Sequence, residues 1–158
     1  MIRNSKGSTI LWAITIIMVL MITIAGGLTI SYSYFQRSIQ NNNKRQAYLT
    51  AKGIIENIVE KIETDNSEYV NLIPQTEGNS VILTIQLPEE ANLGKVTKAV
   101  IKREEVENKQ IRGWISIYVT VDYADEEEAI KADMQLGRTG NLLKWQLLQY
   151  NHGDEKSE

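Results

Sequence analysis

Residues 7–36 read GSTILWAITIIMVLMITIAGGLTISYSYFQ, a stretch without a single charged side chain. A helix of about 20 apolar residues crosses the hydrocarbon core of a bilayer, and this stretch is longer than that. Backbone polar groups in lipid have to be satisfied within the segment, so a single span of this kind adopts an α-helix even where β-branched residues abound. We therefore expect residues 8–36 to form a transmembrane helix.

The helical pattern continues beyond this stretch, because apolar residues recur there at spacings near three and four, as on one face of an amphipathic helix. These positions are Ile39, Ala47, Ala51, Ile54 or Ile55, Ile58 and Ile62. Residues 37–64 are thus predicted to continue the helix. One helix from Ser8 to about Glu63 would be about 80 Å long. Asn41-Asn42-Asn43 and Gly53 are its weak points, and the polar cluster Thr64-Asp65-Asn66-Ser67 ends it.

After residue 64 the apolar period changes to two, which predicts β-strands. We expect strands at 81–87, 96–103, 114–123, 130–136 and 143–147. Short polar turns between them predict antiparallel hairpins, so residues 65–150 should form an antiparallel sheet domain. One apolar face of such a sheet needs a cover, and the apolar stripe over 47–62 is available. The expected fold class is α+β, with a long N-terminal transmembrane and amphipathic helix packed on a C-terminal antiparallel β-sheet.

Aromatic and glycine residues punctuate the apolar stretch. Trp12 is expected near one membrane interface, and Tyr32, Tyr34 and Phe35 near the other. Gly26-Gly27 lowers helix stability and permits a bend or a close helix approach. The alternative is a glycine pair that the membrane helix merely tolerates.

Residues 1–7 form a short basic leader that carries Arg3 and Lys6 and no acidic residue. The apolar stretch is too long for the core of an ordinary secretory signal, and the best small-residue cleavage site, Ala25-Gly26-Gly27, lies far along it. The positive-inside count is ambiguous because basic residues also follow the span. The short leader and the acidic C-terminal part favour an extracytoplasmic C-terminal domain on a single-pass membrane protein.

The sequence offers no catalytic, cofactor or metal set. The chain has a formal net charge of −3, no cysteine and one histidine, His152, in a polar tail over 151–158 that we expect to be exposed to solvent. The acidic run at 125–128 lacks the spaced ligands of an EF-hand, so a solvated hairpin tip is favoured over a weak calcium site. Glu104-Glu105-Val106-Glu107 is interpreted in the same way. We expect no enzyme activity.

A basic stretch around the second expected strand comprises Lys95, Lys98, Lys102 and Arg103. We interpret it as an edge strand that lysine keeps soluble. Contact with DNA or with an anionic neighbour is the alternative, but the acidic composition gives DNA no support. Without a glycine-rich phosphate loop, any ATPase that serves this protein would be another chain.

Lys6-Gly7-Ser8 directly precedes the apolar stretch, and a long helix and an antiparallel sheet follow. In this arrangement the chain resembles the type IV pilins and type II secretion pseudopilins, of the minor kind. Residues 46–53, QAYLTAKG, are also similar to a stretch common in minor pilins and in the tip pseudopilin.

The resemblance implies that a prepilin peptidase cuts between Gly7 and Ser8 on the cytoplasmic side, and that Ser8 becomes a methylated N-terminus. It implies filament packing through Trp12, Gly26 and Gly27. The implied partners are other pilin subunits, the peptidase, an inner-membrane assembly platform and membrane lipid. The implied function is structural: the subunit initiates or caps a type IV pilus, a competence pseudopilus or a secretion pseudopilus at the cell surface.

One position departs from the family pattern. Major pilins usually carry a glutamate five residues into the cut chain, where this chain has Trp12. A carboxylate at membrane depth costs roughly 2.5–3.5 kcal/mol on insertion scales, and major subunits are thought to pair it with a neighbour's terminal amine. A subunit that begins a filament has no subunit ahead of it, so Trp12 favours a minor, tip-type pilin. The alternative is an interface tryptophan on a membrane-anchored binding module that joins no filament.

Overall fold

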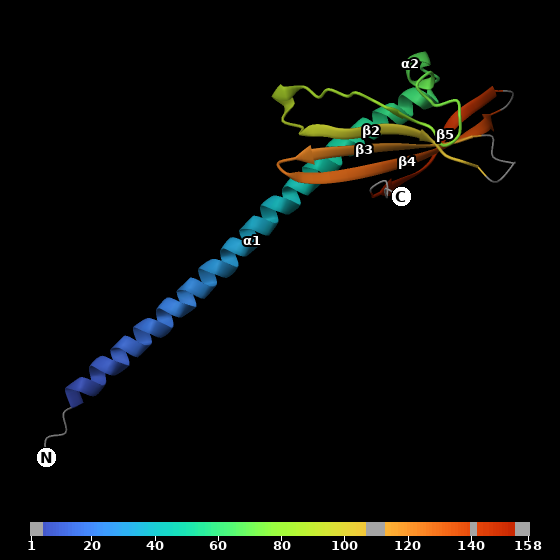
Figure 1. Cartoon of the computed structure of the whole chain (residues 1–158). Coiled ribbons are helices and arrows are strands. Elements are labelled where there is room, and N and C mark those ends of the chain that lie inside the picture. Colours follow the sequence, from blue (N-terminus) through green and yellow to red (C-terminus); the bar gives the residue numbers. More distant parts are fainter. Residues whose placement is uncertain (1–4, 107–112, 140–141, 154–158) are drawn as a thin grey trace. The chain divides into compact units, whose positions relative to one another are not determined.

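The computed structural model describes residues 5–106, 113–139 and 142–153 (Figure 1). By its internal contacts the chain divides into two compact units, Met1–Asn41 and Asn42–Glu158, and the first helix contributes residues to both. The elements are, in chain order, α1 (Ser5–Glu63), α2 (Ser67–Val70), β1 (Ser80–Ile82), the 3₁₀-helix η1 (Glu89–Ala91), β2 (Lys95–Arg103), β3 (Trp114–Tyr123), β4 (Glu126–Thr139) and β5 (Leu142–His152).

The helix α1 is continuous, so neither the three asparagines at 41–43 nor Gly53 interrupts it. It begins at Ser5, slightly before the expected start at Ser8. It ends as predicted at the polar cluster after Glu63, where Asp65 adopts the left-handed backbone conformation with φ 55°. The Asn66 side chain then caps α2 by accepting a 3.0 Å hydrogen bond from the backbone N–H of Glu68.

The sheet in the unit Asn42–Glu158 is a five-stranded antiparallel meander in the order β1-β2-β3-β4-β5. In the central hairpin, Tyr123 pairs with Glu126, which leaves a two-residue turn of Ala124 and Asp125. Both turn residues have positive φ, 52° and 65°. A turn with two left-handed residues follows the right-handed twist of its strands, so it suits this hairpin.

The part of α1 that belongs to this unit lies against one face of the sheet (Figure 1). Ala47, Ala51 and Ile55 have no exposed surface, so the predicted α+β arrangement and the predicted cover are confirmed. The helix contributes Ala47, Ala51, Ile55, Ile58, Val59 and Ile62 to the core, and the sheet contributes Ile101, Ile115, Ile117, Val119, Val121, Ile130, Ala132, Met134 and Trp145.

The first strand is shorter than predicted: β1 is Ser80–Ile82, so it covers only 81–82 of the expected 81–87. Its pairing to β2 extends by one further hydrogen bond, from the N–H of Leu83 to the carbonyl of Ala99 at 2.8 Å. Beyond it, β2 has a register shift between Val96 and Lys98, where it pairs with β3. A bulge bends its strand and increases the local twist, which explains why the apolar alternation over 83–87 forms no ladder.

Two further expectations were wrong about strand ends. Glu126 to Glu128 are the first residues of β4 and not a solvated tip, which Ala124 and Asp125 form instead. His152 closes β5 and does not belong to a polar tail.

The lysine-rich strand β2 was expected at the edge of the sheet. Over Val100 to Lys102, however, β1 pairs with it and is the outer strand. As a strand, β2 is confirmed with the expected end at Arg103.

Candidate functional site

The apolar segment in the unit Met1–Asn41 is a lone helix in this single chain. Every side chain described between Thr9 and Asn41 is exposed, and the large apolar ones from Ile10 to Phe35 are all more than half exposed. Among the described residues, α1 is the one helix long and apolar enough to cross a membrane. Apolar surface of this extent is stable only out of water, in lipid or against other apolar helices.

The distance along the helix between the aromatic residues at its two ends can be compared with the thickness of a membrane. Trp12 is 67% exposed and Tyr32 is 65% exposed. At 1.5 Å per residue, about 30 Å of helix separates them, which matches the thickness of a bilayer's hydrocarbon core. Indole and phenol rings favour the two membrane interfaces, so the spacing is suited to a membrane span.

Three threonine hydroxyls within the apolar segment are satisfied by the helix itself. Thr15 Oγ1 donates to the carbonyl of Leu11 and Thr29 Oγ1 to that of Ala25, each at 2.9 Å. Thr23 Oγ1 donates in the same way to the carbonyl of Val19. These hydroxyls therefore need no partner from the surroundings, which removes the main penalty for placing them in hydrocarbon. These threonines were not predicted as site residues, although threonine in an apolar helix is itself a signal for this hydrogen bond.

The predicted site residues all lie along α1, with Gly7, Ser8 and Trp12 near its start and Gly26 and Gly27 about four turns further on. Gly7 and Ser8 are in its first turns, and Lys6 of the leader is helical too, whereas Arg3 lies outside the described residues. Gly26 and Gly27 remain helical, and a Cβ at either would meet no atom within 4 Å. The structure thus brings none of these residues together into a pocket.

The face of the sheet opposite the helix carries a buried polar cluster that the sequence analysis missed. The Asp133 side chain is only 3% exposed. Its Oδ1 accepts hydrogen bonds from Ser116 Oγ at 2.8 Å and Lys131 Nζ at 2.9 Å. Its Oδ2 accepts from Gln149 Nε2 at 3.1 Å and Asn151 Nδ2 at 3.0 Å. Strands β3, β4 and β5 each contribute, so the cluster ties three strands together.

The two charges of this cluster stabilise each other. Burial opposes ionisation of Asp133, but the hydrogen bonds from Lys131, Gln149 and Ser116 and the charge of Lys131 outweigh it and hold the pKa of Asp133 below its ordinary value. Burial likewise works against the charge on Lys131. The hydrogen bond and charge of Asp133, with a smaller contribution from Tyr118, outweigh it and raise the pKa of Lys131. Both carboxylate oxygens of Asp133 accept hydrogen bonds from neighbouring side chains of the sheet, so we interpret the cluster as structural.

The acidic residues at the start of β4 also have separate partners. Glu126 Oε2 is 3.6 Å from Lys44 Nζ of α1, and Glu127 Oε1 accepts from Thr97 Oγ1 at 2.8 Å. Glu128 Oε2 is 3.0 Å from His152 Nε2. The expectation of a purely solvated histidine is thereby corrected, although the His152 side chain is still 61% exposed. Within the described residues, no group of three or more such side chains is placed to share a metal ion.

Two basic residues at the end of β2 are engaged within the sheet domain. Lys102 Nζ lies 3.4 Å from Glu104 Oε2, and Arg103 Nη1 donates to the carbonyl of Pro74 at 3.1 Å. Glu104 itself is partly buried, which corrects the expectation that it lies in a fully solvated segment. These pairings give DNA contact no support.

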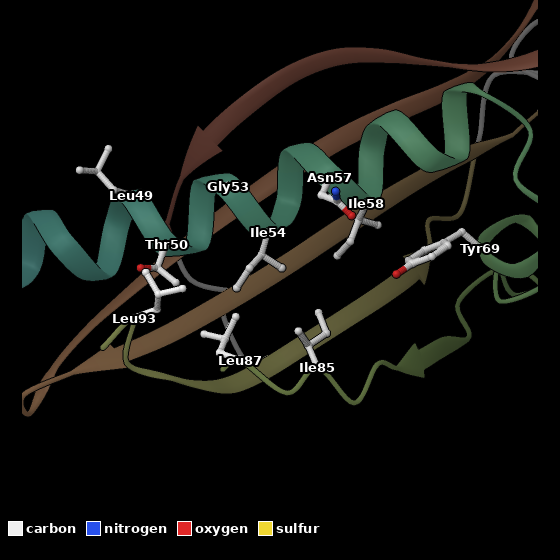
Figure 2. Close-up of a pocket in the computed structure, with 10 residues that line it drawn as sticks. All are labelled: Leu49, Thr50, Gly53, Ile54, Asn57, Ile58, Tyr69, Ile85, Leu87 and Leu93. Carbon is white, nitrogen blue, oxygen red and sulfur yellow. The ribbon is translucent and has the colours of Figure 1, made fainter. Parts of the chain in front are cut away.

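An apolar hollow of about 420 Å³ opens beside α1, between Gly53 and the stretch from Ile85 to Leu93 (Figure 2). Its size is within the range of small-molecule sites, and no sequence pattern indicated it.

Comparison with known proteins leaves the family of this chain open. No protein-family model, no curated protein and no solved structure matches it.

Proposed function

We propose that this protein is a minor pilin-like subunit that initiates or caps a type IV pilus or pseudopilus. In this proposal a prepilin peptidase removes residues 1–7 by cutting between Gly7 and Ser8, and Ser8 is then methylated. The helix from Ser8 onward is held in the membrane and is afterwards transferred into a filament of other pilin subunits. The sheet domain is extracytoplasmic throughout and lies at the cell surface after assembly.

The observation that carries this proposal is that the side chains of one continuous helix change from exposed to buried along its length. Up to Asn41 the described side chains of α1 are exposed, while Ala47, Ala51 and Ile55 are completely buried against the sheet. The second part is therefore satisfied within its own domain, and the first part needs an apolar environment from outside. Lipid and the helices of other subunits are both such environments, so transfer between them is not grossly uphill.

Trp12 supports a place at the beginning of a filament. It stands where a major subunit would present a buried carboxylate, and its exposed ring offers apolar contact and an indole N–H but no charge for a neighbour's terminal amine. The sequence has no acidic residue at all between Gly7 and Gln36 that could take the place of this carboxylate. A subunit without this carboxylate needs no terminal amine from a subunit ahead of it, so it can be the first subunit of the filament.

The decisive experiment is cleavage by a co-expressed prepilin peptidase. We expect N-terminal sequencing to find a chain that begins at Ser8. A Gly7→Leu variant should stay uncut, because a bulky side chain replaces the glycine at the cut. A Gly26→Leu variant serves as the matched control, since a Cβ at Gly26 meets nothing in this chain, and it should be cut like the wild type. Efficient cutting of Gly7→Leu, or no cutting of the wild type, would refute the proposal.

A single-pass membrane-anchored binding module is the second candidate, and the hollow beside Gly53 favours it. It predicts that the chain keeps residues 1–7 in the cell and that it is absent from sheared surface filaments. Immunoblotting of the sheared fraction and of the membrane fraction separates the two candidates.

A further inference from the structure

The strand β5 is one of the two edges of the sheet, and its composition is that of a strand that pairs readily with its own kind. It has 11 residues, whereas β1 at the other edge has 3. It contains no proline, no aspartate or glutamate and a single lysine, Lys144. Its exposed large apolar side chains are Leu142, Leu143, Leu148 and Tyr150. A long edge strand of this kind is a template for a strand of another chain.

The ladder with β4 determines which backbone groups of β5 point outward. The N–H of Gly153 donates to the carbonyl of Ala129 at 3.3 Å, and hydrogen-bonded pairs alternate with non-bonded pairs in an antiparallel ladder. In the register of β4 and β5, Asn151 therefore bonds to β4, while Tyr150 and His152 direct their N–H and C=O groups away from it. No further strand of the described residues lies on that side.

Glu63 occupies an outward group at the centre of this edge. Its Oε1 accepts a 2.9 Å hydrogen bond from the N–H of Leu147, beside the register shift of the β4–β5 ladder. Asp65, just after α1, lies with its Oδ2 3.2 Å from Lys144 Nζ, so the charge of β5 is paired within the chain. A strand added along β5 would have to displace the Glu63 carboxylate from Leu147.

The helix gains nothing from a glutamate at this position. Glu63 is the last residue of α1, where the partial negative charge of the helix terminus disfavours a carboxylate. Burial, and then the charges of Glu56 and Glu63, raise the pKa of Tyr150, so the Glu63 carboxylate also lies close to an outward residue of β5. Within the described residues, the hydrogen bond to Leu147 is the contact that offsets the unfavourable position of Glu63.

We infer that Glu63 blocks the open edge of β5 and keeps it from pairing with β5 of a second copy of this chain. With Glu63 in place, the Leu147 N–H is bonded and a carboxylate stands where the backbone of an added strand would run. Without it, the outer side of β5 is open on both sides of its centre. Two copies related by a two-fold axis would then pair their β5 strands antiparallel. The inference uses only the sheet domain and does not rest on the filament proposal.

Glu63→Ala in the full-length chain, held in a mild detergent, tests this inference. We expect sedimentation velocity to show a dimer whose dissociation constant is lower than that of the wild type by about 10-fold or more, the value of a hydrogen bond to a charged group. Near-ultraviolet circular dichroism checks that the variant is folded. Glu60→Ala is the matched control, because it removes the same charge from an exposed helix position three residues earlier. It should sediment like the wild type.

Amide hydrogen exchange, followed by NMR, identifies the surface that associates. In the Glu63→Ala dimer the N–H groups of Leu147 and Tyr150 should exchange at least about 10-fold more slowly than in the diluted monomer, because a second strand now bonds to this side of β5. The N–H of Asn151 is the internal reference, since it already bonds to β4. Adding Leu148→Lys places a charge on this edge and should return Glu63→Ala to the monomer.

Glu63→Gln separates the hydrogen bond from the charge. It keeps an acceptor oxygen for Leu147, so it should dimerise less than Glu63→Ala. Four results would overturn the inference: a folded Glu63→Ala as monomeric as the wild type, a dimer whose Leu147 and Tyr150 amides exchange as in the monomer, equal association of Glu60→Ala, and equal association of Glu63→Gln and Glu63→Ala. None of them bears on cleavage at Gly7, so the two proposals fail separately.

Discussion

Ser116 and Asp133 face each other directly across the β3–β4 ladder, and the serine hydroxyl donates a 2.8 Å hydrogen bond to the aspartate. Both side chains are almost completely buried although they lie on the sheet face that α1 does not cover. The neighbouring side chains Lys131, Gln149 and Asn151 enclose the carboxylate and bond to it. This face of the sheet is thus held by one shared acceptor instead of an apolar layer.

Asp133→Ala should destabilise the sheet domain by about 2–4 kcal/mol, because it leaves a buried hydroxyl, two amides and an ammonium group without their acceptor. Urea unfolding of the full chain in a mild detergent, followed by near-ultraviolet circular dichroism, measures the loss. Glu105→Gln is the control, since Glu105 is exposed, and it should change stability by less than about 0.5 kcal/mol. Equal stability of Asp133→Ala and the wild type would contradict the role given to the cluster.

The same carboxylate should make stability depend on pH in the acid range. The folded chain holds the pKa of Asp133 below the unfolded value of 3.8. Its stabilisation is therefore complete above about pH 4 and is lost as pH falls through the folded pKa. The free energy of unfolding of the wild type should exceed that of Asp133→Asn at pH 7, and the difference should shrink steadily below pH 4. A difference that grew toward low pH would reverse the sign of the shift.

Ala124→Asn should stabilise the central hairpin by about 0.5–1 kcal/mol. Ala124 has φ 52°, a left-handed conformation that an alanine side chain disfavours and asparagine tolerates. Thermal unfolding measures the gain. Ala91→Asn makes the same chemical change at an exposed position without positive φ and should be close to neutral. A loss of stability in Ala124→Asn would show that the turn is not of the expected type.

Ile22→Lys should weaken membrane insertion by roughly 2.5–3.5 kcal/mol, the scale for a lysine at the centre of a membrane helix. Ile22 lies near the middle of the uncharged stretch and is 71% exposed. The measurement is the share of the chain that stays with membranes after alkaline extraction. Ile39→Lys, beyond Arg37, provides the control and should extract like the wild type. Full retention of Ile22→Lys would argue against a span centred there.

The helix, its end and its cover over 47–62 were predictable because each follows from a local pattern. The run of uncharged residues, the spacing from Ala47 to Ile62 and the polar cluster after Glu63 need no knowledge of distant residues. The strand β3 was predicted with its observed bounds for the same reason. Its alternation is complete, since it lies between two neighbours and has one face against the helix.

The errors occur where strand pairing depends on a distant partner. The alternation over 81–87 predicts a full strand, but the irregular register of β2 near Val96 and Lys98 ends the ladder early. Glu126 to Glu128 have the composition of a tip and are nevertheless paired with β3. His152 was assigned to the tail because its pairing to Ile130 of β4 is not visible in the local sequence.

For the candidate site too, the features that depend on a local sequence pattern were predictable, and those assembled from distant residues were not. The sequence indicates the apolar segment and Gly7-Ser8, whose cleavage stays a prediction. It does not reveal the Asp133 cluster, which is assembled from three strands, or the hollow, which needs α1 and the stretch before β2 to be placed together.

The hydroxyls of Thr15, Thr23 and Thr29, which bond to the backbone of α1, affect how easily this helix can change its surroundings. Each is already bonded to a backbone carbonyl of the preceding turn, so exchanging one apolar medium for another breaks no polar bond at these positions. The free energy of such a move then depends on how well the apolar side chains of the helix pack against their new neighbours. In the proposed transfer from lipid into a filament, these three hydroxyls would keep their partners, and the packing of the apolar side chains would decide how stable the new position is.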